Sequence, residues 1–398
     1  MGARIDPEVA RLVNTDAAFA ELVEELASEE LYGFDTEFHR ERTYYPRLAL
    51  LQVCWPGRIA LVDPLAIDVA DFAKVLDGPG LAVVHACDQD LEVLRRACGT
   101  LPGKMFDTQL TAGFVGMSAP SLGSLTERLL SVHLEKGDQL TDWTRRPLAA
   151  EQLRYAANDV AYLLELYEVL SGQLERRGRR AWAEAECELA LSRGRGEVVP
   201  EEVWWKLRQA RQLRGKSRGV AQEVAAWRER RAQELDVPVR SVLPDLALVS
   251  IAQRPPKGRR DLEQVRTIDS RHLGGGAAEA LLRAVEAGAA LSPDRLHLPP
   301  LSEGETAARP AAALAAAWVQ ERARQLEIDP AILATRADVV AYLKSPPSGR
   351  LLDSWRHELV GEPLRRLVAG ELAVAFEGTS LVLEERTRRP VAKEPATG

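Results

Sequence analysis

The chain has 398 residues, which is too long for one ordinary domain and predicts about two to four. Its 52 lysines and arginines against 59 aspartates and glutamates give a formal net charge of -7, and 46% of its residues are hydrophobic, as in ordinary globular proteins. A net acidic chain gives no global reason to expect nucleic-acid binding, so such a function has to come from local basic patches.

The cysteines and the hydropathy pattern indicate a compartment. Cys54, Cys87, Cys98 and Cys187 show no C-x-x-C spacing, which predicts free thiols in a reducing cytosol and neither disulfides nor zinc ligands. The first residues contain no apolar segment of signal-peptide length, and no run approaches the roughly 18 uncharged apolar residues of a membrane span. We therefore predict a cytoplasmic protein without a membrane partner.

The first part of the chain predicts one helix followed by three strands. The helix covers 16–28, with Asp16 as its N-cap. The strands cover 31–38, 48–55 and 58–62, the last two joined by a tight turn at Pro56-Gly57. Because such short connections join antiparallel neighbours, these strands are expected to form a meander.

The first of these strands carries two acids one residue apart. Side chains alternate along a strand, so Asp35 and Glu37 share one face while Phe34, Thr36 and Phe38 share the other. Two carboxylates this close raise each other's pKa and repel, and a divalent cation relieves both effects. Taken alone the pattern is weak, because most such pairs are a solvated face.

A second acid-bearing segment follows a buried strand. After a helix over 68–76, the continuous apolar run 81–85 predicts a strand parallel to the first, because a helix crosses between them. The next helix begins near Asp88 and places Asp90 in its first turn. Asp88 as N-cap and Asp90 as a favourable charge at a helix start is one interpretation. The other is that strand ends gather functional groups, which brings Asp90 near the two acids of the first strand.

From 108 to about 170 the pattern is mostly helical, which predicts a mixed sheet with helices on its faces. A helix beginning near 147 or 148 carries an apolar stripe made of Leu153, Ala157, Val160, Leu164 and Tyr167. Tyr155 and Asp159 lie one turn apart on another face. They are either a solvated helix side or a pair that serves metal and water together.

The second half is predicted to be helical and locally basic. A helix through Trp182 and Glu188 leads into a flexible joint at 193–196. Segment 203–240 then carries ten basic residues against four acids, a local charge of about +6. This surface is either a solvated helix face or a phosphate-tracking face, and the sequence favours neither. Trp204, Trp205 and Trp227 are predicted to be core residues.

Together the three acid-bearing segments resemble the ribonuclease D family of DEDD-type 3′→5′ exonucleases, in the subclass with a tyrosine in the third motif. Asp35 to Phe38 resembles the first motif, His85 to Glu92 the second, and Tyr155 with Asp159 the third. Further agreement lies at 42–46, 106–109 and 141–143. The resemblance implies a mixed sheet of the RNase H type and two divalent ions, Mg²⁺ or Mn²⁺, held by Asp35, Glu37, Asp90 and Asp159. Tyr155 would then orient the attacking water, since tyrosine is a poor base at its ordinary pKa.

The second half resembles the helical accessory domain shared by ribonuclease D and some helicases. Trp205, Arg208, the run 212–214 and the run 226–228 carry this likeness, and 311–376 looks like a weaker second copy, in which Ala317-Trp318 parallels Ala226-Trp227. We thus expect an α/β domain followed by two all-α domains. The expected division is an exonuclease domain at 1–170, a helical linker at 171–200, helical domains at 201–291 and 311–376, a Pro-rich linker at 292–310 and a disordered tail at 377–398.

The resemblance implies a metal-dependent 3′→5′ exoribonuclease that releases nucleoside monophosphates from RNA, with tRNA precursors as substrate and no obligate protein partner. The candidate substrate-binding residues are His85, Gln52, Gln109, Arg208, Arg211, Arg214 and Lys216. The two glutamines are equally well explained as polar residues at the edges of elements, and a histidine at a strand end, such as His85, is more often a satisfied structural residue than a ligand. Asp107 is predicted to cap a helix, and Asp63 to form a turn. The alternatives are a DNA-directed exonuclease of the same fold and a nucleic-acid-binding adaptor with a vestigial site; the adaptor would have lost an acid, and none of the four is lost.

Overall fold

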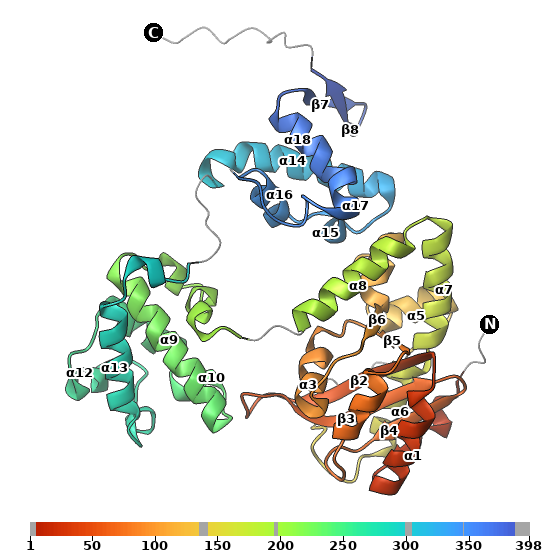
Figure 1. The fold of residues 1–398 in the computed structure, drawn as a ribbon, viewed down its shortest axis with the longest axis horizontal. Coiled ribbons are helices and arrows are strands. Elements are labelled where there is room, and N and C mark those ends of the chain that lie inside the picture. The colour runs from red at the N-terminus through yellow and green to blue at the C-terminus, as the bar shows by residue number, and fades with distance from the viewer. Residues whose placement is uncertain (1–4, 135–141, 195–197, 299–304, 345, 387–398) are drawn as a thin grey trace.

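The computed structural model of the chain describes residues 5–134, 142–194, 198–298, 305–344 and 346–386, with the side chains of 305–309 left aside. An α/β domain is followed by two helical domains (Figure 1), as the sequence predicts. Among the described residues, no helix combines the length and the apolar character needed to cross a bilayer.

The α/β domain is built on a six-stranded sheet in the order β1-β4-β3-β2-β5-β6. The strands are β1 (Arg11–Val13), β2 (Leu31–His39), β3 (Arg47–Trp55), β4 (Arg58–Val62), β5 (Leu81–Val84) and β6 (Lys104–Asp107). The predicted antiparallel meander of β2, β3 and β4 is confirmed, and so is the parallel pairing of β2 with β5. Strands β1 and β6 are not predicted, because segments of three and four residues are too short to show an alternation and, unlike β5, neither is a continuous apolar run.

Helices cover both faces of this sheet. They are α1 (Asp16–Ala27), α2 (Ala73–Leu76), α3 (Asp88–Cys98), α4 (Thr108–Ala112), α5 (Leu122–Leu130), α6 (Ala150–Ala161), α7 (Leu163–Arg176) and α8 (Arg180–Gly194). Helices α1 and α3 pack on the face that carries Phe34 and Leu51, and α6 and α7 pack on the face that carries Leu50 and Cys54. All four cysteines are buried free thiols.

Several predicted helix boundaries are wrong. Thr15, not Asp16, caps α1, and Cys87, not Asp88, precedes α3. The helix expected over 68–76 is a 3₁₀ turn at Ala70–Phe72 followed by the four residues of α2. The helix expected from 147 begins at Ala150 and is interrupted at Tyr162. Because of this interruption, the buried residues after Val160 are Leu163 and Leu166, and not Leu164 as predicted. Of the joint expected at 193–196, the first two residues belong to α8, which continues to Gly194, and the last two lie outside the described residues.

The first helical domain has a hydrophobic core of its own. It begins with two 3₁₀ turns, Pro200–Lys206 and Ala210–Gln212. Its helices are α9 (Lys216–Leu235), α10 (Val239–Val242), α11 (Asp245–Gln253), α12 (Arg259–Glu263) and α13 (Ala277–Ala289). Trp204 lies in the core at 2% exposure, as predicted, whereas Trp205 and Trp227 pack against the core and are only partly buried.

The second helical domain contains α14 (Glu305–Leu326), α15 (Pro330–Leu333), α16 (Arg336–Tyr342), α17 (Ser354–Arg356), a π-helical turn (His357–Gly361) and α18 (Glu362–Val368). Two expectations are corrected here. The linker expected up to 310 already belongs to α14 from Glu305. The tail expected to be disordered from 377 contains the end of β7 (Leu372–Glu377) and all of β8 (Ser380–Glu385), which form an antiparallel hairpin. Residues 387–398 lie outside the described part of the chain.

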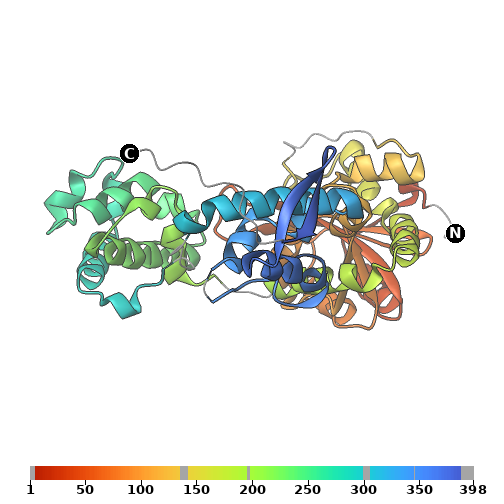
Figure 2. The same cartoon turned by 90° about the horizontal axis from the view of Figure 1, so that it is seen from above.

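The two helical domains relate differently to the exonuclease domain (Figures 1 and 2). The second one shares a continuous core with it: the rings of Trp182 and Trp355 stack with centroids 5.1 Å apart, and Arg356 forms a buried ion pair with Glu186. The first has its separate core and contacts the loop between β2 and β3. In that loop the Tyr44 hydroxyl lies 2.6 Å from Oε1 of Glu229 on α9.

Candidate active site

Strand β2 presents Asp35 and Glu37 to the face covered by α6. Asp35 pairs with Gln52 and Glu37 with Leu50 across the β2–β3 register, so all four share this face. Phe34 and Thr36 are buried on the opposite face at 1% and 5% exposure, which is the predicted alternation. β2 pairs with β5 only as far as Gly33. Beyond Gly33, β2 no longer pairs with β5, and the first turn of α3 contacts this edge of β2 instead.

Asp90 reaches β2 from the first turn of α3. One of its carboxylate oxygens accepts a hydrogen bond from the Thr36 hydroxyl. The turn before α3 is held by Asp107, whose carboxylate accepts from the backbone N–H groups of Ala86 at 3.1 Å and Cys87 at 3.2 Å. The same carboxylate caps α4, as predicted. Asp107 thus joins the ends of β5 and β6 and fixes where α3 begins, a role that the sequence analysis missed.

Helix α6 contributes Tyr155 and Asp159, which are hydrogen-bonded to each other. The chain entering α6 is anchored by Arg146, which binds both carboxylate oxygens of Asp63 at 2.6 and 2.7 Å and the carbonyl of Ala49 at 2.6 Å. Asp63 makes the predicted turn by accepting from the Leu65 N–H, but it is also half of this anchor. The sequence alone could not pair Asp63 with an arginine 83 residues away.

The four acids act on one another electrostatically. Burial raises the pKa of Asp35, and the charges of Asp90, Asp159 and Glu37 raise it further. Burial, Asp159 and Asp90 raise the pKa of Glu37 to about 8. Burial raises the pKa of Asp159 to about 7 and also raises that of Asp90, while hydrogen bonds from Tyr155 and Thr36 oppose these shifts. Within the part of the chain that the structure describes, no lysine or arginine is among the causes of the four pKa shifts.

This donor set fits divalent cations. It consists of carboxylate oxygens, which magnesium and manganese prefer, and its negative charge is not compensated by a described basic side chain. Within the described residues, no three His, Cys, Asp or Glu side chains already have the spacing of a metal site. The fit therefore rests on the charge and chemistry of the acids and not on a preformed cage.

The other candidates near the sheet have structural partners or are enclosed. His85 Nδ1 lies 2.9 Å from the Thr108 hydroxyl, and burial lowers the pKa of the imidazole. Gln109 donates its side-chain N–H to the carbonyl of Pro120 at 3.1 Å. Gln52 is completely buried. Complete burial rules out Gln52 as a contact for sugar or phosphate, whereas His85 and Gln109 are half-buried and stay predictions.

Apart from Arg218, which donates to the carbonyl of Leu213 at 2.8 Å, the ten basic residues of segment 203–240 in the first helical domain divide into two groups. Arg228, Arg230, Arg231 and Arg240 are ion-paired with acids of the same domain. The five residues Lys206, Arg208, Arg211, Arg214 and Lys216 are exposed and form no ion pair within the described residues. We call these five residues the basic cluster.

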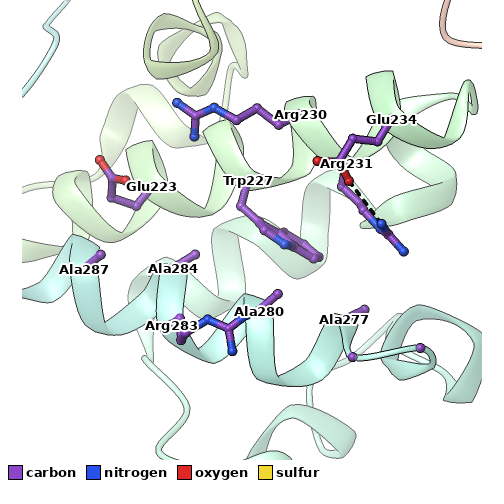
Figure 3. Close-up of a pocket in the computed structure, with 12 residues that line it drawn as sticks. Glu223, Trp227, Arg230, Arg231, Glu234, Ala277, Ala280, Arg283, Ala284 and Ala287 are labelled. Carbon is purple, nitrogen blue, oxygen red and sulfur yellow. Dashed lines mark hydrogen bonds and ion pairs between the residues drawn. The ribbon is translucent and has the colours of Figure 1, made fainter.

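A separate groove of about 460 Å³ lies between α9 and α13 (Figure 3). Trp227 points into it from α9, opposite the small side chains of Ala280 and Ala284 on α13. The prediction that Trp227 is a core residue is therefore only partly right. The arginines of α9 that line the groove are ion-paired, Arg231 with Glu234 and Arg230 with Glu201, so their charge is less available than that of the basic cluster.

Comparison with known proteins identifies the class. Residues 10–175 match the family described as 3′-5′ exonuclease, and residues 217–285 match the HRDC domain. The first match contains all four acids and Tyr155. The class defined by fold and site is thus a 3′→5′ exonuclease carrying an HRDC domain.

Relatives of full length give the family. The chain is 33% identical to the ribonuclease D of Gluconacetobacter diazotrophicus, over 92% of this chain and 95% of that protein, and 32% identical to that of Acidiphilium cryptum over the same shares. The crystal structure of Escherichia coli RNase D, described as an exoribonuclease involved in structured RNA processing, superposes with a TM-score of 0.81 at 31% identity, covering 91% of this chain and 99% of that one. The chain belongs to the ribonuclease D family and is a hydrolytic 3′→5′ exoribonuclease.

Proposed function

We propose that Asp35, Glu37, Asp90 and Asp159 hold two divalent cations, Mg²⁺ or Mn²⁺, and that the site releases nucleoside monophosphates from RNA 3′ ends by in-line hydrolysis. The observation that carries this proposal is the raised pKa of all four acids, which burial causes and which the charges of the neighbouring acids increase at Asp35 and Glu37. Bound cations at such a site supply activation of water and neutralisation of charge on the attacking and leaving oxygens.

The side chains around the acids have distinct tasks in this proposal. The Thr36 hydroxyl donates to one oxygen of Asp90 and so fixes the direction of this carboxylate. Tyr155 stays protonated, because burial and the charges of Asp159, Glu37 and Asp35 raise the pKa of its hydroxyl. A protonated tyrosine orients a water through its hydroxyl group and is not a general base at neutral pH.

We infer that the substrates are structured RNAs with a single-stranded 3′ extension, of which tRNA precursors are the expected class. The similar Escherichia coli enzyme is described as acting in structured RNA processing. The basic cluster supports a contact to the RNA body, since five exposed cations without acidic partners suit phosphate binding on a chain whose net charge is -7. The four free thiols favour action in the cytoplasm.

The test compares 5′-labelled RNA and DNA of equal sequence, each with Mg²⁺ and with EDTA. We expect single-nucleotide shortening of the RNA from its 3′ end with Mg²⁺, no shortening with EDTA, and loss of shortening in Asp159→Asn. Release of long internal fragments would refute the exonuclease mechanism. Equal rates on DNA would favour the alternative of a DNA-directed exonuclease, and no hydrolysis of either would favour the vestigial adaptor.

A further inference from the structure

Gln52 is a fully buried amide without a hydrogen-bond partner. Its side chain is 0% exposed, and neither Oε1 nor Nε2 bonds to any described residue. Buried amides are normally paired, because an unpaired polar atom is cut off from water and gains nothing in return. A methionine has a similar length and shape and would fill this position without that cost. The presence of an amide here therefore requires a reason other than packing.

The surroundings of Gln52 are apolar except on one side. Along β3, its neighbours on the same face are Leu50 and Cys54, and on β4 it is opposite Leu61. The buried side chains of α6, which covers this face, include Ala156 and Ala157. On β2, Gln52 is directly opposite Asp35.

That position brings the amide within reach of a carboxylate. Directly opposed residues of an antiparallel pair have Cβ atoms about 4.5–5.5 Å apart and share a face. Asp35 is half-buried, and the one described hydrogen bond that lowers its pKa comes from the Thr36 backbone. The Asp35 carboxylate can therefore accept another hydrogen bond, and Nε2 of Gln52 is a donor that has no acceptor among the described residues.

We propose that Gln52 is a positioning residue of the active site, whose Nε2 donates to the carboxylate of Asp35 when the acids hold their cations. The inference rests on the proposed function, because it assigns a role beside the metal-binding acids. Carboxylates that bind metals are commonly fixed by hydrogen bonds from residues behind them, and loss of such a partner weakens metal binding about 10- to 100-fold. The role differs from a contact with sugar or phosphate, which complete burial of Gln52 does not allow.

The experiment compares Gln52→Met with the matched control Leu50→Met. Leu50 is a fully buried neighbour on the same strand and face, opposite Glu37, so its replacement perturbs packing without removing a hydrogen-bonding group. Two quantities are measured: the melting temperature in EDTA and the Kd for Mn²⁺ by titration calorimetry. We expect Gln52→Met to melt at the same temperature as the wild type or a few degrees higher, and to bind Mn²⁺ about tenfold more weakly. Leu50→Met is expected to bind Mn²⁺ as the wild type does.

A wild-type Kd for Mn²⁺ in Gln52→Met would overturn the proposal, and so would equal weakening in Leu50→Met. Should Gln52→Met fail to fold, a crystal structure of the wild type soaked in Mn²⁺ decides: Nε2 within hydrogen-bond distance of Asp35 supports the proposal, and any other partner refutes it. Asp35→Asn tests the proposed function separately. Wild-type Mn²⁺ binding in Asp35→Asn would refute the metal-ligand assignment itself, whereas normal binding in Gln52→Met alone would refute only the positioning role.

Discussion

The hydroxyl of Tyr44, in the loop that follows the catalytic strand β2, lies 2.6 Å from Oε1 of Glu229 on α9 and accepts from Nε2 of Gln233 at 2.9 Å. Next to it, the backbone N–H of Tyr45 donates to Asp236 at 3.1 Å. These bonds join the exonuclease domain to a helical domain that has its own core. The described hydrogen bonds between the two domains therefore all come from this one loop.

Tyr44→Phe should loosen this contact. A hydrogen bond to a charged group contributes about 1.5–3 kcal/mol, less here because the contact is partly exposed. We expect a larger radius of gyration by small-angle X-ray scattering and slower trimming of structured RNA, with hydrolysis of a dinucleotide unchanged. Tyr45→Phe is the control, since no described hydrogen bond uses the Tyr45 hydroxyl. Equal scattering curves for Tyr44→Phe and the wild type would contradict the expectation.

The ion pair between Glu186 and Arg356 should hold the second helical domain on α8. Both side chains are buried, at 5% and 2% exposure, and Arg356 also donates to the carbonyl of Ile332. Glu186→Gln leaves a buried guanidinium charge unpaired and is expected to destabilise the protein by about 3–5 kcal/mol in urea unfolding. The exposed Glu188→Gln serves as control and should be within about 0.5 kcal/mol of the wild type.

The stability of the ion-free protein should fall as pH rises. The pKa of Glu37 moves from 4.5 to about 8 on folding and that of Asp159 from 3.8 to about 7. The folded state therefore binds more protons than the unfolded state between these values, and stability is lost as pH rises through about 7 to 8. Melting curves in EDTA should show a lower Tm at pH 8.5 than at pH about 5, and Mg²⁺ should remove much of the difference.

The variant Glu37→Gln tests whether repulsion among the acids causes the loss of stability at high pH. In EDTA at pH about 8 this variant should be more stable than the wild type by roughly 1–3 kcal/mol, because it removes a charge that its neighbours disfavour. It should also lose hydrolysis of RNA. A variant less stable than the wild type under these conditions would mean that the acids do not repel one another in the ion-free protein.

Tyr155→Phe should separate water orientation from metal binding. Loss of the hydroxyl is expected to lower kcat by roughly 10²-fold, while the Kd for Mn²⁺ stays within about twofold of the wild type. Because the raised pKa keeps the hydroxyl protonated, the pH profile of the wild type should show no tyrosine ionisation near neutral pH. Loss of Mn²⁺ binding in Tyr155→Phe would instead assign the hydroxyl to the cation site.

The basic cluster should set the salt dependence of RNA binding. Removing one cation that binds a phosphate lowers the slope of log K against log salt by roughly 0.7–0.9. Arg208→Ala together with Arg211→Ala should lower it by roughly 1.5, measured by fluorescence anisotropy. Arg230→Ala together with Arg231→Ala removes the same charge from ion-paired residues and should change the slope less. Equal effects of the two pairs would show that the cluster is not a distinct RNA-binding surface.

The sequence by itself determined the local parts of the site. Alternation along β2 fixes that Asp35 and Glu37 share a face, and the helical repeat fixes that Tyr155 and Asp159 stand together, since both follow from backbone geometry over a few residues. The buried strand followed by a helix start offered the position of Asp90 near these acids as one of two interpretations. These regularities need no knowledge of the rest of the fold.

Only the tertiary structure decided what depends on contacts between distant segments. It pairs Arg146 with Asp63, joins Thr36 to Asp90, and sets Gln52 under α6 opposite Asp35. It also merges the second helical domain with the exonuclease core while leaving the first outside, although the sequence predicts the second as a weaker copy of the first. Contacts between residues far apart in the chain depend on which groups are buried together and which charges meet in the folded protein. Patterns over a few neighbouring residues do not specify such contacts.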